Sequence, residues 1–261
     1  MSVFTDQLGH RFQLNQTPQR IISLVPSQTE LLYTLGLDNN VVGITKFCVH
    51  PAQWHQYKKR IGGTKNINFE TIRQLQPDLI IANKEENNKE QVEALQAVYP
   101  VYTSDINNLE EALVMIEQIG HITHTQAPAA ALIENIKQAF GTLQPFSTPV
   151  NTAYLIWQDP FMTVGGDTFI NHQLATCGFK NIFSHRQRYP VVTIQELQQA
   201  NCQLLLLSSE PYPFKDKHIA ALQKQLPHTR IALADGEYFS WYGSRLVNAP
   251  AYFKELMTSL A

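Results

Sequence analysis

A helical stretch in the middle of the chain, with similar segments on either side, most constrains the fold. Residues 108–141 carry apolar side chains at helical spacing, first over 109–119 and again over 129–140. Asn108 occupies an N-cap position, and a second helix start follows at Thr125. The second part alone would span roughly 24 Å at about 1.5 Å per residue. We therefore expect helix throughout this stretch, acting as a strut between two domains.

The flanking segments alternate short apolar runs with helical patterns and match each other at an offset of 125 residues. The apolar run 79–81 coincides with the run 204–206, and the helix-capping Asn68 coincides with Thr193. Alternation of strand and helix favours parallel sheets. We interpret the match as a structural repeat. The alternative is coincidence, since all buried strands of this class are aliphatic.

These patterns predict an α/β fold of two Rossmann-like lobes with mostly parallel sheets, joined by a long connecting helix. The predicted boundaries are 1–107 for the first lobe, 108–142 for the connector and 143–261 for the second lobe. Open α/β sheets bind ligands at the carboxyl ends of their strands, so a cleft between the lobes is the expected site.

Three local elements are also expected. The residues around Gly9 should close a small hairpin that includes 12–14. Ser27 and Glu30 have the spacing of a capping box, which would open a helix that ends at Gly36. A strand over 230–234 should lead into an aromatic loop.

Composition excludes several functional classes. The 261 residues are 44% hydrophobic and 16% charged with a formal net charge of -2, which disfavours disorder and nucleic-acid binding. Three scattered cysteines form neither a disulfide framework nor a zinc motif. No apolar run reaches about 18 residues and no signal peptide is visible, so we expect a protein that is not embedded in a membrane. Without a recognisable catalytic motif, we expect no enzyme and no required cofactor, although a spatially assembled site stays open.

The segment after the strand at 230–234 is aromatic where a loop should be polar. Trp241 and Tyr242 supply flat surfaces, and the Arg245 guanidinium can hold a carboxylate or phosphate. The alternative is an aromatic plug that closes the second lobe, in which Arg245 pairs with Asp235 or Glu237.

A second candidate segment, 45–51, follows the strand expected at 41–44. Cys48 and His50 point the same way if the strand continues, so a soft metal could bind them. The alternative is ordinary packing and polar contacts. Five further candidates also lie near predicted strand ends: Lys46, Trp54, Lys65, Trp157 and Tyr189.

Glu85 and Glu210 form an equivalent pair in the repeat. Each follows the corresponding strand of its lobe, and favourable interaction with a helix dipole would explain both carboxylates. If the repeat is real, they would lie on corresponding outer corners of the two lobes. That arrangement suits docking on a partner.

The chain resembles the helical-backbone (class III) substrate-binding proteins of ABC importers, which include cobalamin, siderophore and haem receptors. The cobalamin-binding branch is the most similar. The resemblance covers most of the chain and depends on the following segments: 20–32 with Gly36, 42–43, 75–81, the central helix, 165–178, 46–51 and 239–245.

This resemblance implies a capture protein of the periplasm or cell envelope that binds a corrinoid or iron chelate and delivers it to an ABC permease. We expect it to be a monomer. The implied ligand contacts are Lys46, Phe47, Cys48, His50, Trp157, Tyr189, Trp241, Tyr242 and Arg245. The resemblance also implies that Glu85 and Glu210 dock on the permease, with Glu86 as a near alternative to Glu85. Because no signal peptide is visible, a cytoplasmic corrinoid or metal-complex carrier is the first alternative and a ligand-remodelling enzyme the second.

Overall fold

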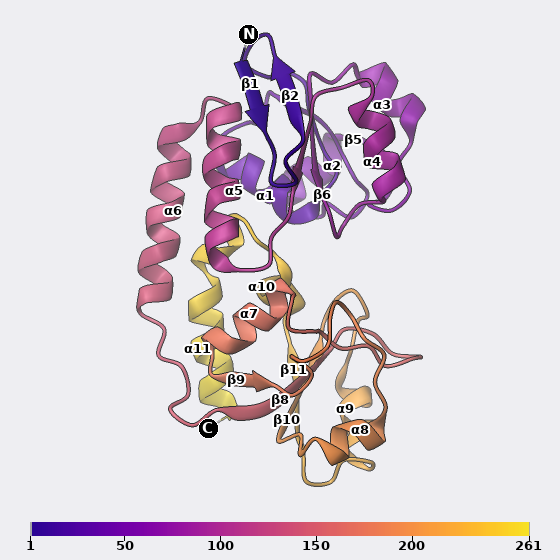
Figure 1. Ribbon diagram of the computed structural model, residues 1–261, viewed down its shortest axis with the longest axis vertical. Coiled ribbons are helices and arrows are strands. Elements are labelled where there is room, and N and C mark those ends of the chain that lie inside the picture. The colour runs from indigo at the N-terminus through magenta and orange to yellow at the C-terminus, as the bar shows by residue number, and fades with distance from the viewer. Residues whose placement is uncertain (1, 261) are drawn as a thin grey trace. The chain divides into compact units, whose positions relative to one another are not determined.

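The computed structural model describes residues 2–260, which divide into two compact units (Figure 1). The first unit comprises Met1–Asp105, Glu110–Ile136 and Tyr242–Arg245. The second comprises Ile106–Leu109, Lys137–Trp241 and Leu246–Ala261. The central segment 108–142, expected as a separate connector, is therefore divided between the units.

The first unit contains a five-stranded parallel sheet in the order β5-β4-β3-β6-β7. Its strands are β3 (Ile21–Ser23), β4 (Val41–Ile44), β5 (Lys59–Arg60), β6 (Leu79–Asn83) and β7 (Val101–Ser104). All residues of β3, β6 and β7 are buried, as expected for a parallel sheet covered on both faces. The helices of this sheet are α1 (Pro26–Thr34), α2 (Ala52–Tyr57), α3 (Phe69–Leu75) and α4 (Lys89–Gln96).

The start of α1 differs from the predicted capping box. The helix begins at Pro26, and its N-cap is Val25, which makes no side-chain cap hydrogen bond. Proline suits the first helical position because its fixed φ is helical and no N–H is needed there. Ser27 consequently lies inside the helix and is buried. The predicted end is confirmed, since Gly36 follows with φ 81°.

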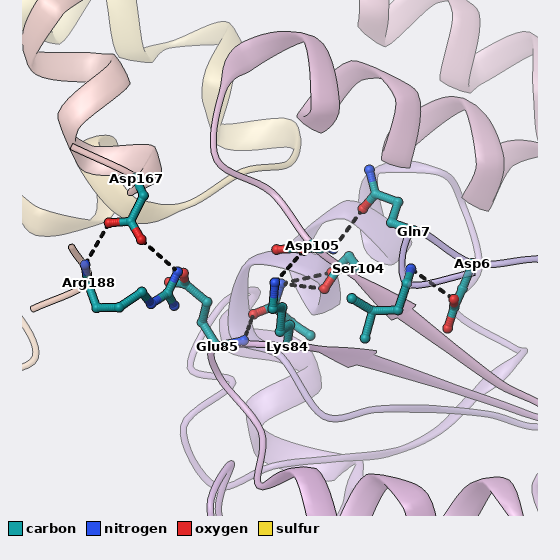
Figure 2. A network of polar contacts seen from close by, with 10 residues as sticks. Asp6, Gln7, Lys84, Glu85, Ser104, Asp105, Asp167 and Arg188 are labelled. Atoms are coloured by element: carbon teal, nitrogen blue, oxygen red, sulfur yellow. Dashed lines mark hydrogen bonds and ion pairs between the residues drawn. The ribbon is translucent and has the colours of Figure 1, made fainter. Parts of the chain in front are cut away.

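The predicted hairpin is confirmed as β1 (Ser2–Thr5) paired with β2 (Arg11–Leu14). Its turn contributes side chains to β7, the last strand in the sheet order. The Thr103 amide donates to Asp6 Oδ2 at 3.1 Å, and the Asp105 amide donates to Gln7 Oε1 at 3.0 Å (Figure 2). Side chains of the hairpin thus accept hydrogen bonds from backbone amides that face outward at the edge of the sheet.

The central stretch forms two helices, α5 (Leu109–Ile122) and α6 (Gln126–Gly141), that lie side by side (Figure 1). The expectation of helix throughout is wrong at 123–125, where His124 has φ 58°. A Cβ at Gly120 would lie 2.6 Å from the Ala129 Cβ. Gly120 thus permits the close approach of the two helices, and the predicted restart near Thr125 is confirmed.

The second unit contains a four-stranded parallel sheet in the order β9-β8-β10-β11. Its strands are β8 (Val150–Leu155), β9 (Phe179–Asn181), β10 (Leu204–Ser208) and β11 (Arg230–Ala234). The longer helices are α7 (Phe169–Thr176), α8 (Ile194–Gln199), α9 (Asp216–Gln223) and α11 (Ala249–Leu260).

The two sheets have the same topology, which confirms the structural repeat. The order β4-β3-β6-β7 in the first unit corresponds to β9-β8-β10-β11 in the second, and β5 is an addition to the first. The helices before β6 and β10 are both capped as predicted, because Asn68 Oδ1 accepts from Thr71 and Thr193 Oγ1 accepts from Glu196. The predicted α/β class with parallel sheets is confirmed.

The aromatic segment after β11 is helical, so its prediction as a loop is wrong. It forms α10 (Gly236–Ser240), capped by Asp235, and the 3-10 helix η1 (Ser244–Val247). Phe239 of α10 is fully buried, and its ring centroid lies 5.1 Å from that of Tyr154 and 4.8 Å from that of Phe253. Packing of the aromatic rings in the second unit explains why this segment is ordered as a helix.

Candidate functional site

The loop that follows β4 in the first unit presents a cation and an aromatic ring at the surface. Lys46 is exposed, and its Nζ lies 5.0 Å from the ring centroid of Phe47, which is 52% exposed. A Cβ at Gly63 would lie 3.1 Å from a ring carbon of Phe47. The neighbouring turn is therefore shaped to accept this ring, and both groups lie at the carboxyl end of the sheet.

Cys48 lies in the same loop but in a different environment. Its side chain is fully buried, and its Sγ lies 3.1 Å from the hydroxyl oxygens of both Thr29 and Thr45. Burial is the main cause that raises the pKa of this thiol. Direct contact of Cys48 with a ligand therefore requires a rearrangement of the loop.

His50 is partly buried beside this thiol in the sequence. Within residues 2–260, no three histidine, cysteine or acidic side chains gather in a way that could hold a metal ion. Metal binding by Cys48 and His50 stays a prediction.

The ends of β6 and β7 are joined by a buried amide network that orients the loop carrying Glu85 and Glu86. Asn83 Nδ2 donates to the Ser104 carbonyl at 3.1 Å and to its hydroxyl at 3.0 Å. Asn83 Oδ1 accepts from the amides of Glu85 at 2.8 Å and Glu86 at 3.0 Å. The Lys65 ammonium donates to the Glu85 carbonyl. The backbone beneath both carboxylates is thus held in one conformation.

Lys84 and Asp105 form an ion pair next to this network. The Lys84 ammonium lies 2.6 Å from Asp105 Oδ2, and the two residues directly follow neighbouring strands (Figure 2). The pair ties together the carboxyl ends of β6 and β7.

Arg245 pairs with Glu30 of α1. Arg245 Nε donates to Glu30 Oε2 at 3.1 Å, and Nη2 donates to Oε1 at 2.8 Å, which is the bidentate geometry that guanidinium favours. Sequence analysis offered Asp235 or Glu237 as the partner, but the partner shown here is separated from Arg245 by 215 residues. Both side chains are partly buried, and the adjacent Tyr242 is buried.

Trp157 is the exposed aromatic residue at the carboxyl end of β8 in the second unit. It is 40% exposed, and its ring meets the Tyr212 ring edge-on at a centroid distance of 5.7 Å. The Trp157 carbonyl accepts from the Met162 amide at 3.1 Å. Backbone and side chain of Trp157 are therefore both supported while one part of the ring faces solvent.

Tyr189 is partly buried and lies beneath the guanidinium of Arg188, at 5.7 Å from guanidinium carbon to ring centroid. The Arg188 amide donates to Asp167 Oδ1 at 2.6 Å, and the charged groups of this pair are 3.9 Å apart (Figure 2). Here too a cation adjoins an aromatic ring.

Glu210 and Trp241 bond to each other inside the second unit. Trp241 is only 6% exposed, and its indole N–H donates to Glu210 Oε1 at 2.9 Å. The Ser240 hydroxyl donates to the same oxygen at 2.8 Å. Burial, followed by the nearby charge of Glu237, raises the pKa of Glu210 against the lowering effect of these bonds. Glu210 thus holds the end of α10.

Sequence reasoning missed Asn83, Tyr212 and His218, which contact the predicted site residues or the loops that carry them. Asn83 carried a usable signal, because the 125-residue offset pairs it with Ser208 at the end of the equivalent strand. Tyr212 and His218 are ordinary in sequence, and only their contacts show their role.

A family model described as periplasmic binding protein matches residues 21–228, which is most of the chain. The chain belongs to this family. A vitamin B12-binding protein of Vibrio campbellii is 30% identical over 203 residues, which cover 74% of this chain and 72% of that relative. The interpretation of this member of the family as a substrate-binding protein rather than an enzyme is confirmed.

Solved structures agree on the fold. The periplasmic vitamin B12-binding protein of Vibrio cholerae aligns with a TM-score of 0.73 at 22% identity, covering 92% of this chain and 98% of that one. The periplasmic heme-binding protein of the same organism aligns with a TM-score of 0.78 at 20% identity, with the same coverage. In the part of the chain that the structure describes, no helix has the length and apolarity needed to span a membrane.

Proposed function

We propose that this periplasmic binding protein captures a metal chelate, most simply a corrinoid, for delivery to an ABC permease. The observation that carries the proposal is the placement of exposed aromatic rings at the carboxyl ends of both sheets: Trp157 in the second unit and Phe47, with Lys46, in the first. The relative in Vibrio campbellii is a vitamin B12-binding protein.

The chemistry of these groups suits a large, flat ligand with acidic or amide side groups. Aromatic faces pack against a macrocycle through area and ring electrostatics, and a lysine ammonium pairs with peripheral carboxylates or phosphate. Tyr189 with Arg188 adds a second pairing of ring and cation. No covalent step is needed, because capture and release require only differential affinity.

Most of the remaining predicted ligand contacts are not accessible to a ligand in this structure. Trp241, Tyr242 and Cys48 are buried, and Arg245 is paired with Glu30. His50 lies at the end of the same loop as Cys48. The three buried residues would therefore contact the ligand only if the segments that carry them move on binding.

The test is a titration of the purified protein with cobalamin, cobinamide, haem and a ferric hydroxamate siderophore, followed by tryptophan fluorescence and the visible spectrum of each ligand. A corrinoid should bind with the highest affinity of the four. Comparison of cobalamin with cobinamide separates recognition of the corrin face from recognition of the lower nucleotide. The chelate assignment is refuted if none of the four binds to folded protein.

Delivery to a permease, in the periplasm, is the second half of the proposal, with Glu85, Glu86 and Glu210 as the docking residues. Glu85 and Glu86 lie on a loop fixed by Asn83, which presents their carboxylates at a defined place. Substitution of both by arginine should abolish ligand uptake by cells while ligand affinity stays unchanged. A carrier that works without a permease would be indifferent to this change. Glu210→Arg is a poorer probe, because it would also disrupt the bonds to Ser240 and Trp241.

A further inference from the structure

Trp157 rests on a chain of contacts that lies entirely within the second unit. Its ring meets Tyr212 at 5.7 Å with an interplanar angle of 70°. The Tyr212 ring in turn lies 4.7 Å from Phe214 and 5.6 Å from His218, measured between ring centroids. Phe214 and His218 are both buried, whereas Tyr212 is partly exposed. Tyr212 therefore connects a buried aromatic base to an exposed tryptophan.

The backbone of Tyr212 is restricted as well. Pro211 and Pro213 flank it, and proline limits both its own φ and the conformation of the residue before it. The Tyr212 amide donates to the carbonyl of Ile156, the residue directly before Trp157, at 3.3 Å. Main chain and side chain of Tyr212 thus engage the same short segment at the end of β8.

His218 fixes the hydroxyl end of Tyr212. Its Nδ1 accepts from the Lys215 amide at 2.7 Å, at the start of α9, so the other nitrogen, Nε2, carries the proton and donates to Tyr212 Oη at 3.4 Å. A polar group within an otherwise aromatic cluster is costly unless it is bonded on both sides, as His218 is. The imidazole therefore specifies one orientation for the tyrosine ring.

We propose that His218 and Tyr212 are positioning residues. They fix the orientation of the Trp157 ring before the ligand binds, so that the ring forms a preformed wall of the ligand site. The ligand part of this inference rests on the proposed function, but the orientation of Trp157 does not. A preformed wall raises affinity because the side chain loses less freedom when the ligand binds. Removal of the support should therefore weaken binding even though neither residue needs to contact the ligand.

The experiment uses the full chain labelled with 5-fluorotryptophan. The sequence contains three tryptophans, at 54, 157 and 241, so the fluorine spectrum has three resonances, and Trp157→Phe assigns the one of interest. Tyr212→Leu, which removes the ring, should shift and broaden the Trp157 resonance and lower affinity for cobalamin by about tenfold, near the upper end for an aromatic pair. Tyr212→Phe keeps the ring and should cost about twofold, as should His218→Leu. His218→Gln retains a donor and an acceptor and should restore the resonance of the unchanged protein.

Tyr33→Leu is the matched control. Tyr33 meets Trp54 edge-on at a centroid distance of 5.4 Å in the first unit, so this change removes the same kind of ring pair elsewhere. It should disturb the Trp54 resonance and leave both the Trp157 resonance and ligand affinity unchanged.

Two results would overturn the proposal. One is an unchanged Trp157 resonance in folded Tyr212→Leu protein. The other is a changed resonance with unchanged affinity for a ligand that Trp157→Ala weakens. If the unmodified protein binds no chelate, the proposed function fails, and the fluorine spectrum alone then decides whether His218 and Tyr212 position Trp157.

Discussion

The two units share a strand order but differ in the chemistry at the carboxyl ends of their strands. In the first unit, Asn83 ends β6 and joins it to β7 through buried amide hydrogen bonds. In the second unit, Ser208 ends the equivalent strand β10, where its hydroxyl bonds to Glu210 and accepts from Tyr154 at 3.1 Å. Polar bonds are thus present at both edges, and the second also carries clusters of aromatic rings around Tyr212 and Phe239.

This difference gives the two equivalent strand ends different surface chemistry. An amide network fixes a loop at defined hydrogen-bond distances, which suits the display of charged groups such as Glu85. An aromatic cluster supplies broad apolar area, which suits contact with a ligand face. The topology is common to both units, and the side chains at the strand ends distinguish them.

The largest effect is expected from breaking the amide network. Asn83→Leu leaves buried partners on Ser104 and on the loop amides unsatisfied, at a cost of roughly 2–4 kcal/mol in unfolding free energy. Ser208→Ala, at the equivalent position, should cost only about 1–2 kcal/mol, because fewer bonds are lost. Urea unfolding of both variants measures the difference. Equal losses would contradict the contrast between the edges.

The second-largest difference is expected between the exposed rings of the two units, in their contributions to cobalamin affinity. Trp157→Ala is expected to reduce cobalamin affinity by about 1–3 kcal/mol, or roughly 5- to 150-fold, because the larger ring is supported from behind. Phe47→Ala should cost less, on the order of 0.5–1 kcal/mol, since Phe47 contacts mainly the flexible Lys46 and the turn at Gly63. Isothermal titration of both variants with cobalamin shows which of the two rings contributes more to affinity. Trp157→Phe, which keeps a ring, should retain most of the affinity.

Glu210 should make stability depend on pH. Its pKa is raised in the folded protein, so its contribution is most favourable at acidic pH, below the ordinary value for glutamate, and is lost as pH rises through the raised value. The acidic groups that face it, Asp235 and Glu237, contribute to this effect. Glu210→Gln keeps an oxygen that can accept from Trp241 and removes the charge that burial disfavours, so it should raise stability near pH 7.

Thermal unfolding at pH 5 and pH 8 measures this effect. The gain in melting temperature should be larger at pH 8. Glu255→Gln on the exposed face of α11 is the control with the same chemical change, and it should show no such dependence. A greater gain at pH 5 would contradict the raised pKa of Glu210.

The smallest difference is expected between the equivalent helix caps. Asn68→Ala should cost about 0.5–1 kcal/mol of stability through the lost bond to Thr71. Thr193→Ala should cost slightly more, about 1 kcal/mol, because Thr193 and Glu196 bond reciprocally. Denaturant midpoints of the two variants provide the comparison, and a clearly larger loss at Asn68 would reverse it.

Much of the frame was predictable from the sequence because its signals are local. Buried strands such as β6 and β10 are continuous apolar runs, and Asn68 and Thr193 cap their helices through residues three positions away. Lys46, Trp157 and Tyr189 were also found by their positions near predicted strand ends. Their roles in ligand binding stay predictions.

The errors arose where distant contacts decide the structure. No local signal pairs Arg245 with Glu30, which is 215 residues away. The helix α10 forms in an aromatic run because Phe239 packs against Tyr154 and Phe253, and such tertiary contacts override local propensity. The support of Trp157 by Tyr212 was likewise invisible, because the two residues belong to separate segments of the second unit.

The amino-terminal hairpin also bears on how this chain is handled as a recombinant protein. Asp6 and Gln7 occupy the outward amides of Thr103 and Asp105, so a shortened chain that begins after Gln7 would leave that strand edge bare. Bare edges recruit strands from other molecules. A trimmed version is therefore expected to aggregate during purification, which makes the first seven residues decisive for obtaining the protein in a monodisperse form.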